Sequence, residues 1–188
     1  MTLLQDFLLE AKIRTKDGEW HSLGIEAYAM DKIFGEEHLY IKKQLKMDNF
    51  HCCDYIYPTQ ESILFIEDTN LIATRDDWKK KVGSESSIPR HVFQFISELI
   101  SESIRDEILL KAYGTLLIFD RLLTQCEGAK DRMGNRKLSF WVIVNDADSS
   151  EAQAFDNLQD RIQSTLRALV PEVVIYPLKK AREKLQLL

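Results

Sequence analysis

The chain has 188 residues, of which 45% are hydrophobic and 29% are charged, so it can bury a sizeable globular core without disulfides. Its net charge of −5 excludes the strong overall positive field that draws proteins non-specifically to nucleic acid or to anionic membranes. No apolar run is long enough to span a bilayer, and the three cysteines do not have the spacing of a secreted disulfide framework. We therefore expect one cytoplasmic domain over residues 1–188, with free thiols and no membrane partner.

The first part of the chain is predicted to form two helices followed by three strands. Apolar residues at positions 3, 4, 7, 8, 11 and 13 recur with helical spacing, which predicts a helix over residues 2–15. A second helix is expected over residues 24–34, where a glycine closes it. Three segments rich in Ile, Tyr, Phe and Leu follow, separated by short polar turns, and they predict an antiparallel meander over residues 37–47, 49–58 and 61–72.

The second part alternates helices and strands. Helical periodicity returns over residues 89–126 and predicts two helices, broken near residues 103–106. Residues 137–147 form a continuous apolar run typical of a strand that is buried on both faces. A helix from residue 150 or 151 to residue 169, a short strand over residues 172–177 and a closing helix over residues 178–188 complete the pattern. This order predicts an α/β fold with a mixed central sheet flanked by helices.

Two carboxylates occupy neighbouring strands of the predicted meander. Asp54 lies on the second strand and Glu67 on the third, and paired strands are only about 4.8 Å apart. This acid pair and the αβββαβ order over roughly residues 20–145 resemble the restriction-endonuclease-like, or PD-(D/E)xK, superfamily. Members of that superfamily carry an Asp on the second strand and a Glu or Asp on the third, followed two residues later by a Lys. Here Thr69 occupies the lysine position and Cys53 the proline position.

The resemblance implies hydrolysis of DNA phosphodiesters with a bound Mg²⁺ ion. Asp54 and Glu67 are the implied metal ligands, and Glu26 stands on the preceding predicted helix, where many members place a further acid. Carboxylate oxygens suit Mg²⁺, which activates a water and neutralises phosphoryl charge. Some members place the lysine on the helix after the third strand, so Lys111 is the expected replacement for the motif lysine. Many proteins of this fold form homodimers, so the resemblance implies that this chain can form a homodimer as well.

Other interpretations of the same residues remain open. The fold can serve without catalysis as an accessory module that binds a protein partner, and Asp54 and Glu67 can be solvated carboxylates at strand ends. The adjacent His51, Cys52 and Cys53 invite comparison with a zinc site, but alternate residues of a strand face opposite ways and no second ligand pair has zinc-like spacing. Buried thiols are the expected result. The sequence also lacks the motifs of phosphate loops, dinucleotide-binding folds, serine esterases and zinc proteases.

Overall fold

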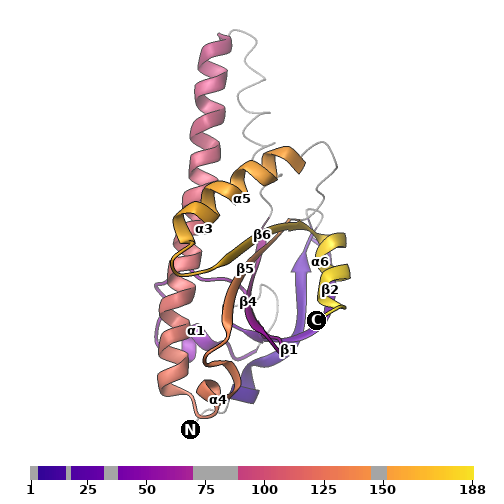
Figure 1. Ribbon diagram of the computed structural model, residues 1–188, viewed down its shortest axis with the longest axis vertical. Helices are drawn as coiled ribbons and strands as arrows, with labels where there is room; N and C mark the ends of the chain where they lie inside the picture. Colours follow the sequence, from indigo (N-terminus) through magenta and orange to yellow (C-terminus); the bar gives the residue numbers. More distant parts are fainter. Residues whose placement is uncertain (1–3, 16–17, 32–37, 70–88, 145–151) are drawn as a thin grey trace.

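The computed structural model describes residues 4–15, 18–31, 38–69, 89–144 and 152–188. A mixed six-stranded open sheet forms its centre, with the strands in sequential order and helices on both faces (Figure 1). The first four strands pair antiparallel, and the last two continue the sheet parallel to the fourth. In order, the strands are β1 (Leu8–Arg14), β2 (Trp20–Ala29), β3 (Tyr55–Pro58), β4 (Ser62–Thr69), β5 (Lys137–Val144) and β6 (Glu172–Pro177). The α/β class and the mixed sheet are confirmed.

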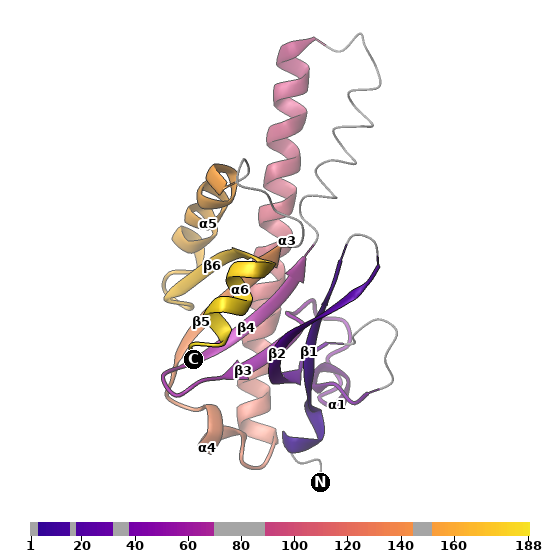
Figure 2. The ribbon, with the colours of Figure 1, turned by 90° about the vertical axis from the view of Figure 1, so that its right-hand side faces the viewer.

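The helices differ greatly in length, and the longest one packs against one face of the sheet (Figure 2). They are the 3₁₀ turn η1 (Leu4–Phe7), α1 (Ile41–Gln44), α3 (Arg90–Gln125), α4 (Ala129–Met133), α5 (Ala152–Leu166) and α6 (Leu178–Leu185). Figure 2 shows α3 behind the sheet and α6 in front of it, and the N-terminal part of α3 extends beyond the sheet. Within the described part of the chain, no helix is long and apolar enough to cross a membrane.

An apolar cluster covers each face of the sheet. The larger cluster lies on the α3 side, where the rings of Phe65 and Phe119 meet edge to face with centroids 5.1 Å apart. The smaller cluster lies under α6 and includes Ile66 and Trp141. Because side chains alternate along a strand, Glu67 points to the same face as Phe65, toward α3. Strand β5 is buried on both faces over Ser139–Val144, as its continuous apolar run predicts.

Both helices predicted near the N-terminus are wrong. Residues 4–14 form η1 and β1, and residues 20–29 form β2, which pairs with β1 and then with β3. In β1 the apolar residues Leu9, Ala11 and Ile13 alternate with charged residues, so the period is two rather than 3.6. A register shift lies opposite Ala11, where Gly24 supplies a φ of 76° that only glycine adopts easily. Strand pairing therefore overrides the helical propensity of this region.

Three further boundaries differ from the prediction. The described part of segment 37–47 contains the helical turn α1 instead of a strand, and β3 covers only the end of segment 49–58. The two helices predicted over 89–126 are one continuous helix, α3. The proposed break at residues 103–106 contains neither Gly nor Pro, and Ile104 continues the buried stripe without interruption. Strands β4, β5 and β6 and helices α5 and α6 fall within their predicted segments.

Candidate functional site

The structure brings Asp54 and Glu67 together where β3 begins and β4 approaches its end. The Asp54 amide donates to the Ile66 carbonyl oxygen at 3.0 Å, and the Asp54 carbonyl oxygen accepts from the Met30 amide at 2.8 Å. The Asp54 carboxylate accepts a hydrogen bond from the Asp68 amide at 2.7 Å. Glu67, which precedes Asp68 on β4, is fully buried on the face of the sheet that α3 covers. The two acids therefore occupy one rim of the sheet.

Lys111 contacts the Glu67 carboxylate from helix α3, and its charge also acts on Asp54. Its ammonium forms an ion pair and hydrogen bond with Glu67 Oε1, and it also lies 3.9 Å from Glu107 Oε1, one helical turn earlier. The structure thus places the lysine expected from the resemblance beside the predicted acid pair. Thr69, at the motif position itself, lies at the end of β4 and carries no charge. The positive charge beside Glu67 comes instead from Lys111, which is 44 residues after Glu67 in the chain.

Gly114 and Thr115 explain why α3 holds Lys111 at this point. The Thr115 hydroxyl accepts a hydrogen bond from the Cys53 amide at 2.8 Å and donates to the Lys111 carbonyl oxygen at 2.7 Å. Gly114 lies so close to the chain before β3 that an added Cβ would overlap the carbonyl oxygen of His51. The helix backbone therefore contacts the segment that leads into Asp54, and the position of Lys111 follows from that contact.

Burial raises the pKa of both carboxyl groups. The pKa of Asp54 rises from 3.8 to about 6, although the Asp68 amide and the Lys111 ammonium both act to lower it. The pKa of Glu67 lies well above its usual value, because burial and the charge of Asp54 outweigh the attraction of Lys111. Burial opposes the charge of Lys111, but Glu67 and Asp54 together raise its pKa above that of an ordinary lysine. The cluster therefore favours uptake of a proton or of a further cation.

Asp31 and Lys42 extend the cluster, and neither is among the site residues predicted from the sequence. Asp31 stands shortly after β2, and its Oδ2 accepts a hydrogen bond from Lys42 Nζ, on α1, at 2.6 Å. The charge of Asp31 raises the pKa of Asp54, and the charge of Lys42 lowers it. The sequence predicts a helix at Asp31 and a strand at Lys42, and neither residue lies in such an element, so the pattern gives no indication that the two are close. One signal was present in the sequence: Asp31 follows an apolar run directly, as Glu67 does.

Glu26 does not join the acid pair. It lies on β2 instead of a helix, its side chain is exposed, and its partner across the sheet is Glu10 on β1. Asp54 bonds to Met30, four residues after Glu26 and just past the end of β2, which corresponds to about 13 Å at about 3.3 Å per residue. The expectation that Glu26 contributes a third metal ligand is therefore not supported by its position.

The donor set at the cluster fits a hard divalent ion. Glu67 Oε2 is buried and has no hydrogen-bond partner among the described residues, which is a costly state for a carboxylate oxygen. Asp54 Oδ2 accepts the hydrogen bond from the Asp68 amide, so the lone pairs of Asp54 Oδ1 can bind a ligand. Across the described residues there is no set of three His, Cys, Asp or Glu side chains able to hold a metal. Two carboxylates nevertheless suffice for Mg²⁺, which takes its other ligands from water and substrate phosphate.

The cysteines beside the cluster are structural. Cys52, Cys53 and Cys126 are free and buried, as the sequence predicts. Burial raises the pKa of each of the three thiols. Cys52 Sγ lies 3.8 Å from Asp31 Oδ2, within reach of a weak S–H hydrogen bond. A protonated, buried thiol is a poor nucleophile and a poor metal ligand, so the chemistry of the site falls to the carboxylates and lysines.

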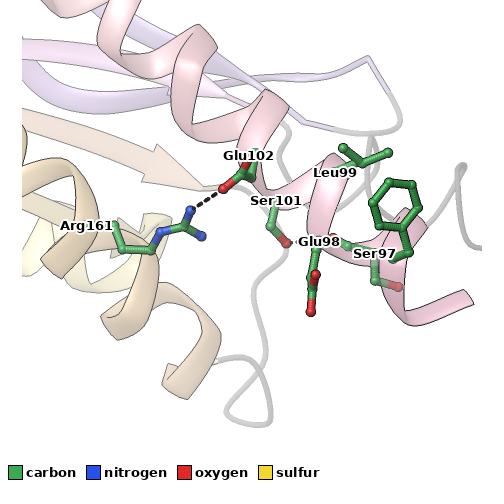
Figure 3. Close-up of a pocket in the computed structure, with 7 residues that line it drawn as sticks. Ser97, Glu98, Leu99, Ser101, Glu102 and Arg161 are labelled. Atoms are coloured by element: carbon green, nitrogen blue, oxygen red, sulfur yellow. Dashed lines mark hydrogen bonds and ion pairs between the residues drawn. The ribbon is translucent and has the colours of Figure 1, made fainter. Parts of the chain in front are cut away.

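Away from this cluster, a hollow lies between α3 and α5 (Figure 3), with a volume of about 540 Å³. Its lining residues are exposed or half-exposed: Phe95, Ser97, Glu98, Leu99, Ser101, Glu102 and Arg161. Arg161 Nη2 donates to Glu102 Oε1 at 3.1 Å, but both side chains are more than 40% exposed, so water and salt screen this ion pair. The hollow contains no buried charged group, and the cluster around Glu67 is the better candidate for chemistry.

The elevated pKa of Asp54 predicts an unusual pH dependence of stability. At Asp54 the folded protein retains a proton that the unfolded chain releases near pH 3.8, so the contribution of Asp54 to stability falls as the pH rises from about 4 to about 6 and is then constant. Asp54→Asn cannot ionise and keeps an oxygen for the Asp68 amide. In metal-free buffer we expect it to exceed the wild type in free energy of unfolding by ~2–3 kcal/mol at pH 8 and to match it at pH 4, measured by urea unfolding.

Asp68→Asn is the matched control for this measurement. Asp68 is the next acid on β4, its side chain points to the opposite face, and its carboxylate accepts the Arg14 amide at 2.7 Å, a bond that Asn retains. This variant should show no comparable gain at pH 8. An Asp54→Asn effect of equal size at both pH values would contradict the assignment of a raised pKa to Asp54.

Comparisons with known proteins assign neither a family nor a function to this chain. No family model matches the chain, and no curated protein or solved structure matches it. The mixed sheet and the charged cluster at its rim are therefore the observations from which a function can be argued.

Proposed function

We propose that this chain is a restriction-endonuclease-like, metal-dependent nuclease that hydrolyses DNA phosphodiesters with Mg²⁺ held by Asp54 and Glu67. The observation that carries the proposal is the convergence of two carboxylates from neighbouring strands with the Lys111 ammonium from the following helix. A fully buried Glu67 with an unpartnered oxygen lowers stability, and such groups are concentrated at functional sites. The succession of three antiparallel strands, a helix and a parallel fourth strand, from β2 to β5, supports the same proposal.

Each residue of the cluster has a distinct task in this scheme. Asp54 and Glu67 hold the ion, and Lys111 orients the Glu67 carboxylate with one of its three N–H donors. The remaining donors of Lys111 can stabilise negative charge on the attacking oxygen or on the phosphate. When bound, Mg²⁺ would lower the pKa of a coordinated water and neutralise phosphoryl charge. Thr69 can contribute a hydroxyl group but no charge, so the proposal depends on Lys111 as the source of positive charge.

A second candidate function is a non-catalytic module that binds a protein partner. The observation that favours it is the exposed apolar surface of α3, where Phe95, Leu99, Leu110 and Leu117 are each more than half exposed. In that case the Lys111–Glu67 pair serves only to stabilise the packing of α3 on the sheet. The two candidates differ in one measurable property, the uptake of divalent metal.

The proposal predicts that the wild-type protein binds Mg²⁺ or Mn²⁺ and cleaves plasmid DNA in a metal-dependent reaction. Asp54→Asn should abolish metal binding in a calorimetric titration and lower the cleavage rate by on the order of a hundredfold or more. Asp68→Asn, the adjacent acid on the other face of β4, should leave both properties near wild type. Wild-type protein that takes up no metal at millimolar concentration would exclude the nuclease and favour the binding module.

A further inference from the structure

Backbone hydrogen bonds fix Lys42 relative to Asp54. The Lys42 amide donates to the Met30 carbonyl oxygen at 3.0 Å, and the Met30 amide donates to the Asp54 carbonyl oxygen at 2.8 Å. The Lys42 carbonyl oxygen accepts a bond from the Met47 amide at 2.9 Å, which secures the other side of α1. Lys42 is therefore attached to the same strand end that carries the candidate site.

The side chain of Lys42 is withdrawn from solvent. It is only 12% exposed, whereas the next residue, Lys43, is exposed on the same short helix. Burial of an ammonium is costly unless a carboxylate compensates it, and Asp31 does so at 2.6 Å. Lysine readily extends its charge into water, so a purely solvated role does not explain this position. The burial of Lys42 indicates that its positive charge acts on the groups of the candidate site, as its effect on the pKa of Asp54 also shows.

Lys42 adds one positive charge to a cluster in which carboxyl groups outnumber ammonium groups. The carboxyl groups are those of Asp31, Asp54, Glu67 and Glu107, and the ammonium groups are those of Lys42 and Lys111. Loss of the Lys42 charge would make the metal-loaded cluster less positive and would weaken its attraction for the negative charge of a phosphodiester.

We propose that Lys42 is a second phosphate-binding residue of this site, whose ammonium contacts a phosphate oxygen of the nucleic-acid substrate while Asp31 holds it in place. An ammonium has three N–H donors, and the bond to Asp31 uses one of them. Lys42 and Lys111 together then supply, from α1 and α3, the positive charge that Thr69 does not provide at the end of β4. This inference rests on the proposed function, because it assigns the substrate contact of the same site.

The test is DNA binding to the whole protein with Ca²⁺ in place of Mg²⁺, followed by fluorescence anisotropy of a labelled duplex. Lys42→Gln keeps a donor for Asp31 but removes the charge. We expect it to weaken binding about tenfold and to reduce the slope of log K against log salt by about one. Lys43→Gln, the exposed neighbour, should change neither quantity, and Lys42→Arg should retain most of the binding. Calcium affinity, measured by calorimetry, should be unchanged or slightly tighter in Lys42→Gln, because a nearby positive charge is lost.

Each outcome of the test has a defined meaning. A Lys42→Gln variant with the affinity and salt slope of the wild type would overturn the assignment of Lys42. If Lys42→Gln does not fold, the double variant Asp31→Asn, Lys42→Gln removes both charges and decides the question with the same two readouts. Wild-type protein that binds DNA in calcium but does not cleave it in magnesium would overturn the proposed hydrolysis and leave the Lys42 contact intact. Wild-type protein that binds no DNA with metal present would overturn the Lys42 contact.

Discussion

Lys111→Met is expected to lower the free energy of unfolding by about 3 kcal/mol and to eliminate metal-dependent cleavage. The substitution keeps the length of the side chain but removes the counter-charge of Glu67, whose carboxylate is fully buried. Removing one partner of a buried ion pair is strongly destabilising because the other charge remains without compensation. Lys111 itself is 23% exposed, which places the expected loss near the lower end of the range for buried pairs. Urea unfolding at pH 7 and the plasmid assay measure the two effects separately.

A double-mutant cycle separates the structural role of Lys111 from its proposed chemical role. Glu67→Gln in the Lys111→Met background removes the uncompensated charge, so most of the lost stability should return while cleavage remains absent. Arg121→Met, which removes an exposed charge elsewhere on α3, should change neither stability nor cleavage appreciably. Equal destabilisation in the single and the double variant would show that Lys111 does not compensate Glu67.

Gly114→Ala should be among the most destabilising single substitutions in the chain, with an expected loss of more than about 3 kcal/mol. In an exposed helix the same change normally stabilises by about 1 kcal/mol, because alanine has the higher helix propensity. Here the new methyl group would overlap the His51 carbonyl oxygen, a backbone atom that no change of rotamer can move. The helix and the segment before β3 would have to separate, which also breaks the Thr115 bond to the Cys53 amide.

The sign of the Gly114→Ala effect makes it a clear test of the helix position. Thermal unfolding followed by circular dichroism gives the midpoint, and Tyr113→Ala is the control because Tyr113 is the exposed residue next to Gly114. The control should shift the midpoint by far less than Gly114→Ala. A stabilised Gly114→Ala variant would mean that α3 does not approach the chain at His51, and the placement of Lys111 beside Glu67 would lose its support.

Strong local patterns in the sequence were sufficient to predict the strands and helices around the parallel part of the sheet. The apolar run of β5, the short β6 bounded by prolines and the amphipathic α5 and α6 all fall within their predicted segments, because burial on both faces or on one stripe leaves a direct trace in the residue pattern. The proximity of Asp54 and Glu67 could be predicted from the sequence for a similar reason. Neighbouring strands of a short meander bring their ends together almost regardless of the rest of the fold.

Local pattern alone was insufficient at the N-terminus. Residues 8–14 fit a helical template through Leu8 and Ala11 and a strand template through Leu9, Ala11 and Ile13. The deciding factor is pairing with β2, a partner that the sequence does not display. The same error misplaced Glu26 on a helix, and it hid the ion pair of Asp31 and Lys42, which depends on where β2 ends and α1 begins.

The sequence by itself therefore determined the α/β class, the later strands and helices, the free buried thiols and the residue types available for a metal site. Only the tertiary structure decided that β1 and β2 are strands, that α3 is continuous, and that Lys111, but not Glu26, lies beside the acids. The physical reason is that strand pairing and helix docking depend on contacts between residues distant in sequence. Gly114 against His51 and Lys42 against Asp31 are two such contacts, and each involves residues whose local pattern is unremarkable.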